Sequence, residues 1–157
     1  MRTKKEMRHY LRQWRGHSPL ADFVLRKGQW FMGRAESDDY EIALEWRRKQ
    51  KPQPQECYFN SQQFCSDCHG FHYFEGYYFI GGTPIEHAWV VMDDGKVVDF
   101  TIEALERKAK QDRSIFIDPM TPLYCGVAIP RYFIVQQTAG NGGRRPLAEL
   151  YYSGRAR

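Results

Sequence analysis

Three side chains in this sequence belong to the types that nucleophilic catalysis uses: Cys57, His87 and Asp99. A thiolate can attack a carbonyl carbon, an imidazole can take the thiol proton and return it to a leaving group, and a carboxylate can orient the imidazole. The three work only when they are held together. Whether these three residues indicate a catalytic site therefore depends on the helices and strands that position them.

The segment that contains His87 and Asp99 predicts a β-hairpin with one of these residues on each arm. Both arms are rich in β-branched and aromatic residues, and Asp93-Asp94-Gly95 between them suits a three-residue loop that ends in a left-handed residue. In that register Met92 pairs with Lys96, and His87 and Asp99 project from one face as diagonal neighbours. A two-residue loop would place them on opposite faces, because a one-residue shift reverses every side chain.

Cys57 stands where a helix is expected to begin. Pro54 and the polar pair Gln55-Glu56 precede a run that can wind as a helix. A thiol in the first turn has its thiolate stabilised by unpaired backbone amides and by the helix dipole. We therefore expect Cys57 to be a nucleophile that reaches the histidine from the start of a helix.

The order of these features resembles the transglutaminase-like branch of the papain-type cysteine enzymes. A cysteine that opens a helix is followed by a strand like residues 73–77, then by His87-Ala88-Trp89 and by Val98-Asp99-Phe100-Thr101. The chain is also similar to bacterial and phage proteins that share this core and a later Tyr-x-Gly, here Tyr124-Cys125-Gly126. The resemblance implies that Cys57 is the nucleophile, His87 the general base and acid, and Asp99 the orienting carboxylate.

The implied function is that of a cysteine-dependent hydrolase or acyltransferase acting on an amide or ester carbonyl through a thioester. Protease, deamidase, amidase and transglutaminase activities all fit, with a protein or peptide as substrate and no cofactor. The oxyanion would be held by the backbone amide of Cys57 and one side-chain donor, for which the candidates are Gln53, Gln55 and Asn60. Trp89 would form a wall of the site.

A second group, Cys65, Cys68 and His72, leaves a metal site open as an alternative. Zinc would need a fourth ligand, which Cys57 or Cys125 would have to supply. The Cys-x-x-Cys-His pattern also matches covalent haem attachment, which is typical of exported proteins. The simpler interpretation is a helix end and a turn, with the cysteines as small buried residues.

The pattern of elements predicts an α+β fold in which an antiparallel sheet, a meander carrying the histidine and aspartate, packs against helices. We expect one domain over residues 1–157. Helices are expected over residues 7–14, 37–49 and 101–112, the last two capped by Ser37 and Thr101, and strands over 71–80, 114–117 and 132–135; residues 23–32 fit a small hairpin or an irregular link. The domain would consist of a helical or irregular extension (1–50), a papain/transglutaminase-like core (55–136) and a flexible tail (137–157).

Composition leaves two other functions open. The net charge of +4 and pI of 8.9 are modest for a nucleic-acid binder, but the basic N-terminal helix could bind nucleic acid or an anionic surface. The alternatives are therefore a catalytically inactive transglutaminase-like binding module and a basic nucleic-acid-associated accessory protein. The sequence predicts neither a secretory signal nor a transmembrane segment, since no apolar run reaches the roughly 20 residues that span a bilayer. With four cysteines, we expect free thiols in the cytoplasm.

Overall fold

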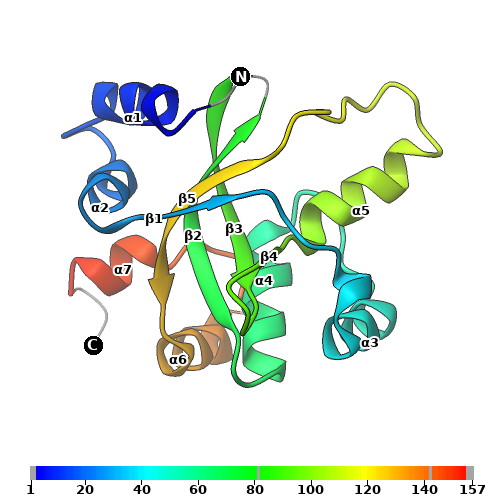
Figure 1. The fold of residues 1–157 in the computed structure, drawn as a ribbon. Coiled ribbons are helices and arrows are strands. Elements are labelled where there is room, and N and C mark those ends of the chain that lie inside the picture. Colours follow the sequence, from blue (N-terminus) through cyan, green and yellow to red (C-terminus); the bar gives the residue numbers. More distant parts are fainter. Residues whose placement is uncertain (1–2, 81, 142, 155–157) are drawn as a thin grey trace.

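A computed structural model describes residues 3–80, 82–141 and 143–154 of the chain. Within these residues the strands form one twisted antiparallel sheet in the order β1-β5-β2-β3-β4, with helices around it (Figure 1). The strands are β1 (Gln29–Met32), β2 (His72–Ile80), β3 (Thr83–Val91), β4 (Val97–Val98) and β5 (Leu123–Ile129). The helices are α1 (Lys4–Gln13), α2 (Pro19–Lys27), α3 (Glu41–Gln50), α4 (Cys57–Asp67), α5 (Phe100–Ala109), α6 (Arg131–Asn141) and α7 (Ala148–Tyr152), with a 3-10 helix at Ser37–Asp39. The predicted α+β class is confirmed.

The hairpin of β3 and β4 has the predicted three-residue loop. The Met92 N–H donates to the Lys96 carbonyl oxygen at 2.9 Å, and the Gly95 N–H donates to the Met92 carbonyl oxygen at 2.9 Å. Gly95 has a φ of 81°, the left-handed conformation that glycine adopts without steric cost. Val90 pairs with Val98, so the predicted register is confirmed.

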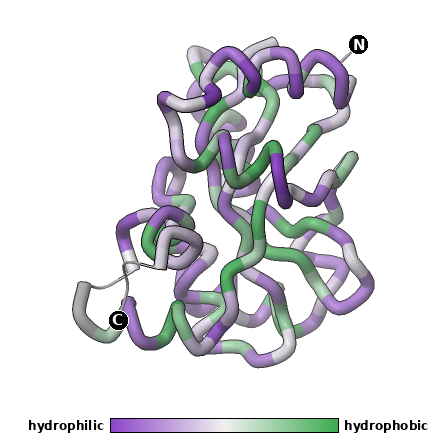
Figure 2. Tube along the Cα trace, turned by 90° about the vertical axis from the view of Figure 1, so that its left-hand side faces the viewer, coloured by the Kyte–Doolittle hydropathy of each residue, from purple (hydrophilic) through white to green (hydrophobic). Residues whose placement is uncertain are grey.

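Side chains of the sheet divide between two hydrophobic clusters, one on each face. The larger cluster takes Tyr73 and Tyr77 from β2 and buried residues from every helix, α1 to α7. The smaller cluster takes the alternate β2 residues Phe74 and Tyr78, together with Trp89 of β3. Figure 2 shows hydrophobic residues along the central strands, whereas α1, near the N-terminal label, is mostly hydrophilic. In the described part of the chain, no helix combines the length and the hydrophobicity needed to cross a membrane.

Strand β4 is short and pairs with only the end of β3. β4 contains only Val97 and Val98, and its register with β3 reaches back no further than Val90. In the described ranges, the part of β3 before Val90 therefore has no strand on that side. Helix α4 packs against β3 and begins at Cys57, as predicted.

A glycine on β5 lets an indole lie directly on the backbone of the sheet. Gly76 of β2 is paired with Gly126 of β5. A Cβ on Gly126 would stand 2.6 Å from a ring carbon of Trp89 and 2.6 Å from the carbonyl oxygen of Glu75, closer than atoms can approach. Gly126 therefore makes room for Trp89, which lies next to His87 in the site described below.

Two predicted strands are absent from the described structure. Residues 132–135 were expected to be a strand, but they lie in α6, where the N–H groups of Phe133 and Ile134 donate to the Pro130 carbonyl oxygen. Both side chains are buried in the larger cluster, and this tertiary packing outweighs the β-propensity of the run. Residues 114–117 form a loop, because the Asp112 side chain accepts from the Ser114 N–H at 3.0 Å and turns the chain.

The helix starts also differ in part from expectation. Ser37 lies in the 3-10 helix and donates its N–H to Glu103 at 2.6 Å, whereas α3 begins later, at Glu41. Thr101 does not cap α5, because the helix already begins at Phe100 and its N-cap is Asp99. Residues 23–32, which fitted either a small hairpin or an irregular link, form the end of α2 and then β1; the N-cap of α2 is Ser18.

Residues 137–157, expected to form a flexible tail, contain the end of one helix and the whole of another. Helix α6 continues to Asn141, and α7 docks on the sheet. Leu147 is fully buried, and the Leu147 and Ala148 N–H groups donate to the Glu75 carboxylate at 2.5 and 2.8 Å. Burial raises the pKa of Glu75 to about 7, although these donors and the Tyr73 hydroxyl favour the ionised form. Residues 142 and 155–157 lie outside the described residues.

We expect Gly126→Ala to lower the free energy of unfolding by about 2–3 kcal/mol, because the new methyl group overpacks the contact with Trp89. Gly16→Ala is the matched control: Gly16 has a φ of 80° and nothing within 4 Å of a built Cβ, so only left-handed strain of about 1 kcal/mol applies. Urea unfolding of both variants measures the difference. An equal or smaller loss for Gly126→Ala would contradict the packing described.

Candidate active site

The hairpin brings the predicted histidine and aspartate into contact. The Nε2 atom of His87 lies 2.7 Å from Oδ2 of Asp99. Both side chains are buried, with His87 7% and Asp99 1% exposed. Because a carboxylate only accepts hydrogen bonds, Nε2 is the donor in this contact.

Asp99 accepts hydrogen bonds from three elements of the fold. Besides the imidazole of His87 on β3, its Oδ2 accepts from the Tyr124 hydroxyl of β5 at 2.9 Å. Its Oδ1 accepts from the Ile102 N–H at 3.1 Å, which caps α5. Burial alone would raise the pKa of Asp99, but the charge of His87 and these donors lower it below its ordinary value. Asp99 is therefore a carboxylate at neutral pH.

The Asp99 carboxylate raises the pKa of His87. Burial alone would lower the pKa of the imidazole, but the charge and hydrogen bond of Asp99, followed by a hydrogen bond with the Cys57 side chain, raise it to about 10. The imidazole is therefore protonated at neutral pH. Since Nε2 is bonded to Asp99, Nδ1 is the ring nitrogen left for the thiol.

Cys57 is the first residue of α4 and is half-buried. The N-cap residue, Glu56, does not cap the helix with its side chain; its carboxylate pairs instead with Arg144 at 3.0 Å. The first backbone N–H groups of α4 are thus left without a side-chain cap, and they point the positive end of the helix dipole at the thiol. A thiol, an imidazolium and a helix start meet at this point.

The three predicted side-chain oxyanion donors differ in their availability. Asn60 is buried and its Nδ2 donates to the Gln53 carbonyl oxygen at 2.8 Å and to the Thr101 hydroxyl at 2.9 Å, so both of its protons are used. Gln53 donates from Nε2 to the Lys51 carbonyl oxygen at 2.9 Å. Gln55 is exposed, has a φ of 67°, and makes no side-chain hydrogen bond among the described residues. Asn60 therefore holds the segment before Cys57 in place, and Gln55 is the free donor.

Trp89 packs beside the imidazole of His87 and is itself buried. The indole is fully buried, and its ring is stacked beside His87 with centroids 6.3 Å apart and planes 20° from parallel. The ring of Tyr124 lies near both, with its centroid 5.0 Å from that of the indole and 6.4 Å from that of the imidazole. Trp89, which was predicted to form a wall of the site, thus lies beside His87 within the smaller cluster, where the absence of a Cβ on Gly126 leaves space for the ring.

The alternative metal ligands are not gathered into a site. Cys65 is buried in the larger cluster, Cys68 follows the last residue of α4, and His72 is exposed at the start of β2. Across residues 3–80, 82–141 and 143–154, no group of three or more His, Cys, Asp or Glu side chains is placed to hold a metal ion. Burial raises the pKa values of Cys65 and Cys68, so both remain thiols.

Sequence reasoning missed two features of the site. Tyr124 was noted only within a Tyr-x-Gly motif, and nothing local shows that its hydroxyl reaches Asp99, because β5 joins the sheet between β1 and β2. Asp99 was assigned an orienting role but no cap. An aspartate directly before a helical pattern is a signal for an N-cap, and that signal could have found it.

Comparisons with known proteins do not assign a family. No family model matches the chain. No curated protein and no solved structure matches it either.

We expect Asp99→Asn to destabilise the protein by on the order of 3 kcal/mol near pH 6, because it leaves a buried imidazolium without its partner. The pKa of His87 is raised from 6.5 to about 10, so the pair stabilises fully below pH 6.5 and its contribution is lost as the pH rises towards 10. The gap between wild type and variant in the free energy of unfolding should therefore be larger at pH 6 than at pH 9.5.

Asp94→Asn is the matched control, since Asp94 is an exposed carboxylate in the hairpin loop. The difference in the free energy of unfolding between wild type and Asp94→Asn should be the same at pH 6 and pH 9.5. Equal gaps for Asp99→Asn at pH 6 and pH 9.5 would contradict the buried ion pair.

Proposed function

We propose that the protein is a cysteine-dependent hydrolase or acyltransferase that acts on an amide or ester carbonyl through a Cys57-His87-Asp99 triad. The observation that carries the proposal is the position of His87. Its ring is bonded to the Asp99 carboxylate at 2.7 Å and shares a hydrogen bond with the Cys57 thiol. This is the order of groups that activates a thiol and orients its base.

In the proposed reaction the proton of Cys57 resides on His87, as the imidazolium described above, and the thiolate sulfur forms a bond to the carbonyl carbon of the substrate. The carbon–nitrogen or carbon–oxygen bond then breaks, and the leaving group takes the proton from His87. A thioester remains on Cys57. His87 then takes a proton from an attacking water, which releases an acid, or from an attacking amine, which transfers the acyl group; in both cases the sulfur leaves as thiolate.

The start of α4 offers electrostatic stabilisation for this reaction. The oxyanion would accept from the backbone N–H of Cys57, which no side chain of Glu56 covers. Gln55 supplies a side-chain N–H from the exposed turn two residues earlier. Donors fixed in the backbone need no reorganisation as the charge develops, so they favour the transition state over the bound substrate.

A protein or peptide is the substrate that this proposal favours. The likeness of the cysteine, His-Ala-Trp and Val-Asp-x-Thr segments to the transglutaminase-like enzymes supports acyl chemistry on peptide-type carbonyls. The choice among protease, deamidase, amidase and transglutaminase depends on which group attacks the thioester. Mass spectrometry of products formed with and without an added primary amine separates these reactions.

We expect limiting iodoacetamide near pH 6 to label Cys57 before the other three cysteines. Cys68 is the sharpest comparison, because it is also half-buried and follows the other end of the same helix. Its pKa is raised by burial and by nearby Asp67, and burial raises that of Cys125 to about 12, so both stay protonated. Peptide mass spectrometry should show at least about tenfold faster labelling of Cys57 than of Cys68.

His87→Ala should slow the labelling of Cys57, and Asp99→Ala should slow it less, while neither change alters the rate at Cys68. Circular dichroism shows that each variant is folded. Labelling spread evenly over the cysteines, or a Cys57 rate that does not respond to His87, would contradict the triad and favour a binding module that keeps the fold without the chemistry.

A further inference from the structure

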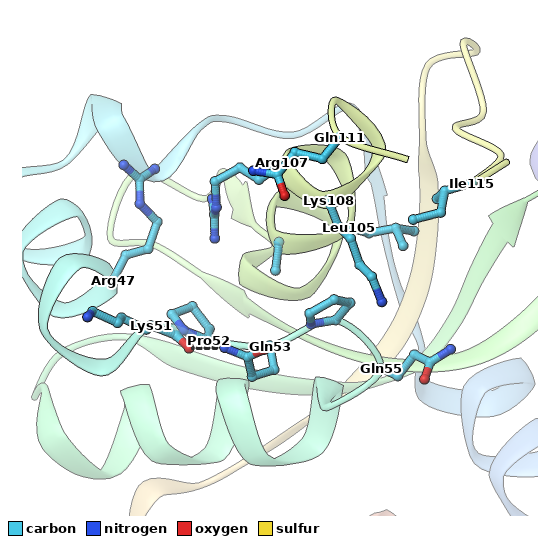
Figure 3. A pocket seen from close by; sticks show the side chains of 12 residues that line it. Arg47, Lys51, Pro52, Gln53, Gln55, Leu105, Arg107, Lys108, Gln111 and Ile115 are labelled. Atoms are coloured by element: carbon cyan, nitrogen blue, oxygen red, sulfur yellow. Dashed lines mark hydrogen bonds between the residues drawn. The ribbon is translucent and has the colours of Figure 1, made fainter. Parts of the chain in front are cut away.

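A groove runs between α5 and the segment that leads into α4. Its volume is about 670 Å³. One wall is α5 with Leu105 and Lys108, and the opposite wall is the linker from Lys51 to Gln55 (Figure 3). Ile115 closes one end, and Arg47 of α3 stands at the other.

The groove is lined with basic, apolar and glutamine side chains and no acidic one. Arg47 is neutralised by an ion pair with Asp38. Within the described ranges, the exposed groups of Lys51, Arg107 and Lys108 make no ion pair. Asp112 lies near enough to Lys108 to sense its charge, but its side chain accepts hydrogen bonds from Ser114. Three cations therefore line one hollow without an ion-pair partner, and the nearby Asp112 carboxylate acts on Lys108 only through its charge.

The groove is lined in part by the residues that precede the nucleophile in the chain. Pro54 and Gln55 line it, and the chain passes from Gln55 through Glu56 to Cys57 at the start of α4. In Figure 3 the side chain of Lys108 extends from α5 towards the end of the groove where Gln55 lies. The linker is fixed in this position, because Asn60, one turn into α4, holds the Gln53 carbonyl oxygen at 2.8 Å. A chain lying along the groove would reach Cys57 at its end.

We propose that this groove binds an acidic segment of a peptide substrate, with Lys51, Arg107 and Lys108 paired to its carboxylates and the adjoining residue presented to Cys57. The inference rests on the proposed function, because it assigns a substrate class to that site. The apolar residues that line the groove provide surface for the backbone and aliphatic parts of an extended peptide; they include Pro52, Pro54, Leu105 and Ile115.

An acidic peptide fits the groove better than a nucleic acid does. Its lining contains no aromatic side chain on which a base could stack. Two of its three free cations, Arg107 and Lys108, are neighbours on one helix, so the charge is local and does not follow a phosphate backbone. The reaction proposed for Cys57 also requires a carbonyl carbon, which a peptide carries at every residue.

Fluorescence anisotropy tests the groove directly. The probe is a fluorescein-labelled glutamate-rich peptide, its control is the same peptide with glutamine in place of glutamate, and the protein carries Cys57→Ala to prevent turnover. We expect the acidic peptide to bind at least about tenfold more tightly than its neutral counterpart. Arg107→Glu with Lys108→Glu should weaken that binding by about tenfold or more.

The matched control is Lys5→Glu with Arg12→Glu, which makes the same change in net charge on exposed residues of α1. It should leave peptide binding within about twofold. Equal weakening by the two double variants, equal binding of the two peptides, or tighter binding of a single-stranded RNA through Arg107 and Lys108 would overturn the assignment. Circular dichroism shows that each variant is folded.

A second measurement ties the groove to the site. In wild-type protein the acidic peptide should slow iodoacetamide labelling of Cys57 and leave the rate at Cys68 unchanged. A peptide that binds through Arg107 and Lys108 but leaves a reactive Cys57 equally accessible would overturn the role of the groove in substrate binding. If Cys57 does not react preferentially at all, the proposed function fails, whereas the anisotropy experiment still decides whether the groove binds the acidic peptide.

Discussion

The buried carboxylate of Asp99 holds together the parts of the fold that form the candidate site. It accepts from His87 on β3, from Tyr124 on β5 and from the backbone of Ile102 on α5. Removing a carboxylate from water is costly, and three donors, one of them charged, offset that cost. The same contacts fix the imidazole, orient the start of α5 and join two strands that are not neighbours in the sheet. Loss of any one donor would leave buried charge incompletely paired.

Two local features bring the thiol to this pair. The left-handed Gly95 sets the register of the hairpin, so that the histidine and aspartate arms meet on one face. Helix α4 then packs against β3, with Cys57 at its start. Because Glu56 is paired with Arg144, the positive end of α4 is left to the thiol.

Sequence reasoning succeeded where short-range chemistry decides the structure. The hairpin register follows from the Asp-Asp-Gly loop, and the start of α4 follows from the proline and polar residues before it. It failed where distant contacts decide. Phe133 and Ile134 favour a strand by propensity but form a helix because both pack into the core. Leu147 docks because Glu75, far away in the sequence, accepts its N–H, and no local pattern indicates that contact.

The central claim is that Asp99 and Cys57 together hold His87 as an imidazolium, and an NMR titration of the His87 ring tests it most directly. The account predicts that the ring stays protonated beyond pH 8, since its pKa is raised to about 10, and that Cys57→Ala lowers the titration midpoint because the thiol hydrogen bond contributes to that shift. A ring that is neutral at pH 7, or a midpoint that does not change in Cys57→Ala, would contradict it.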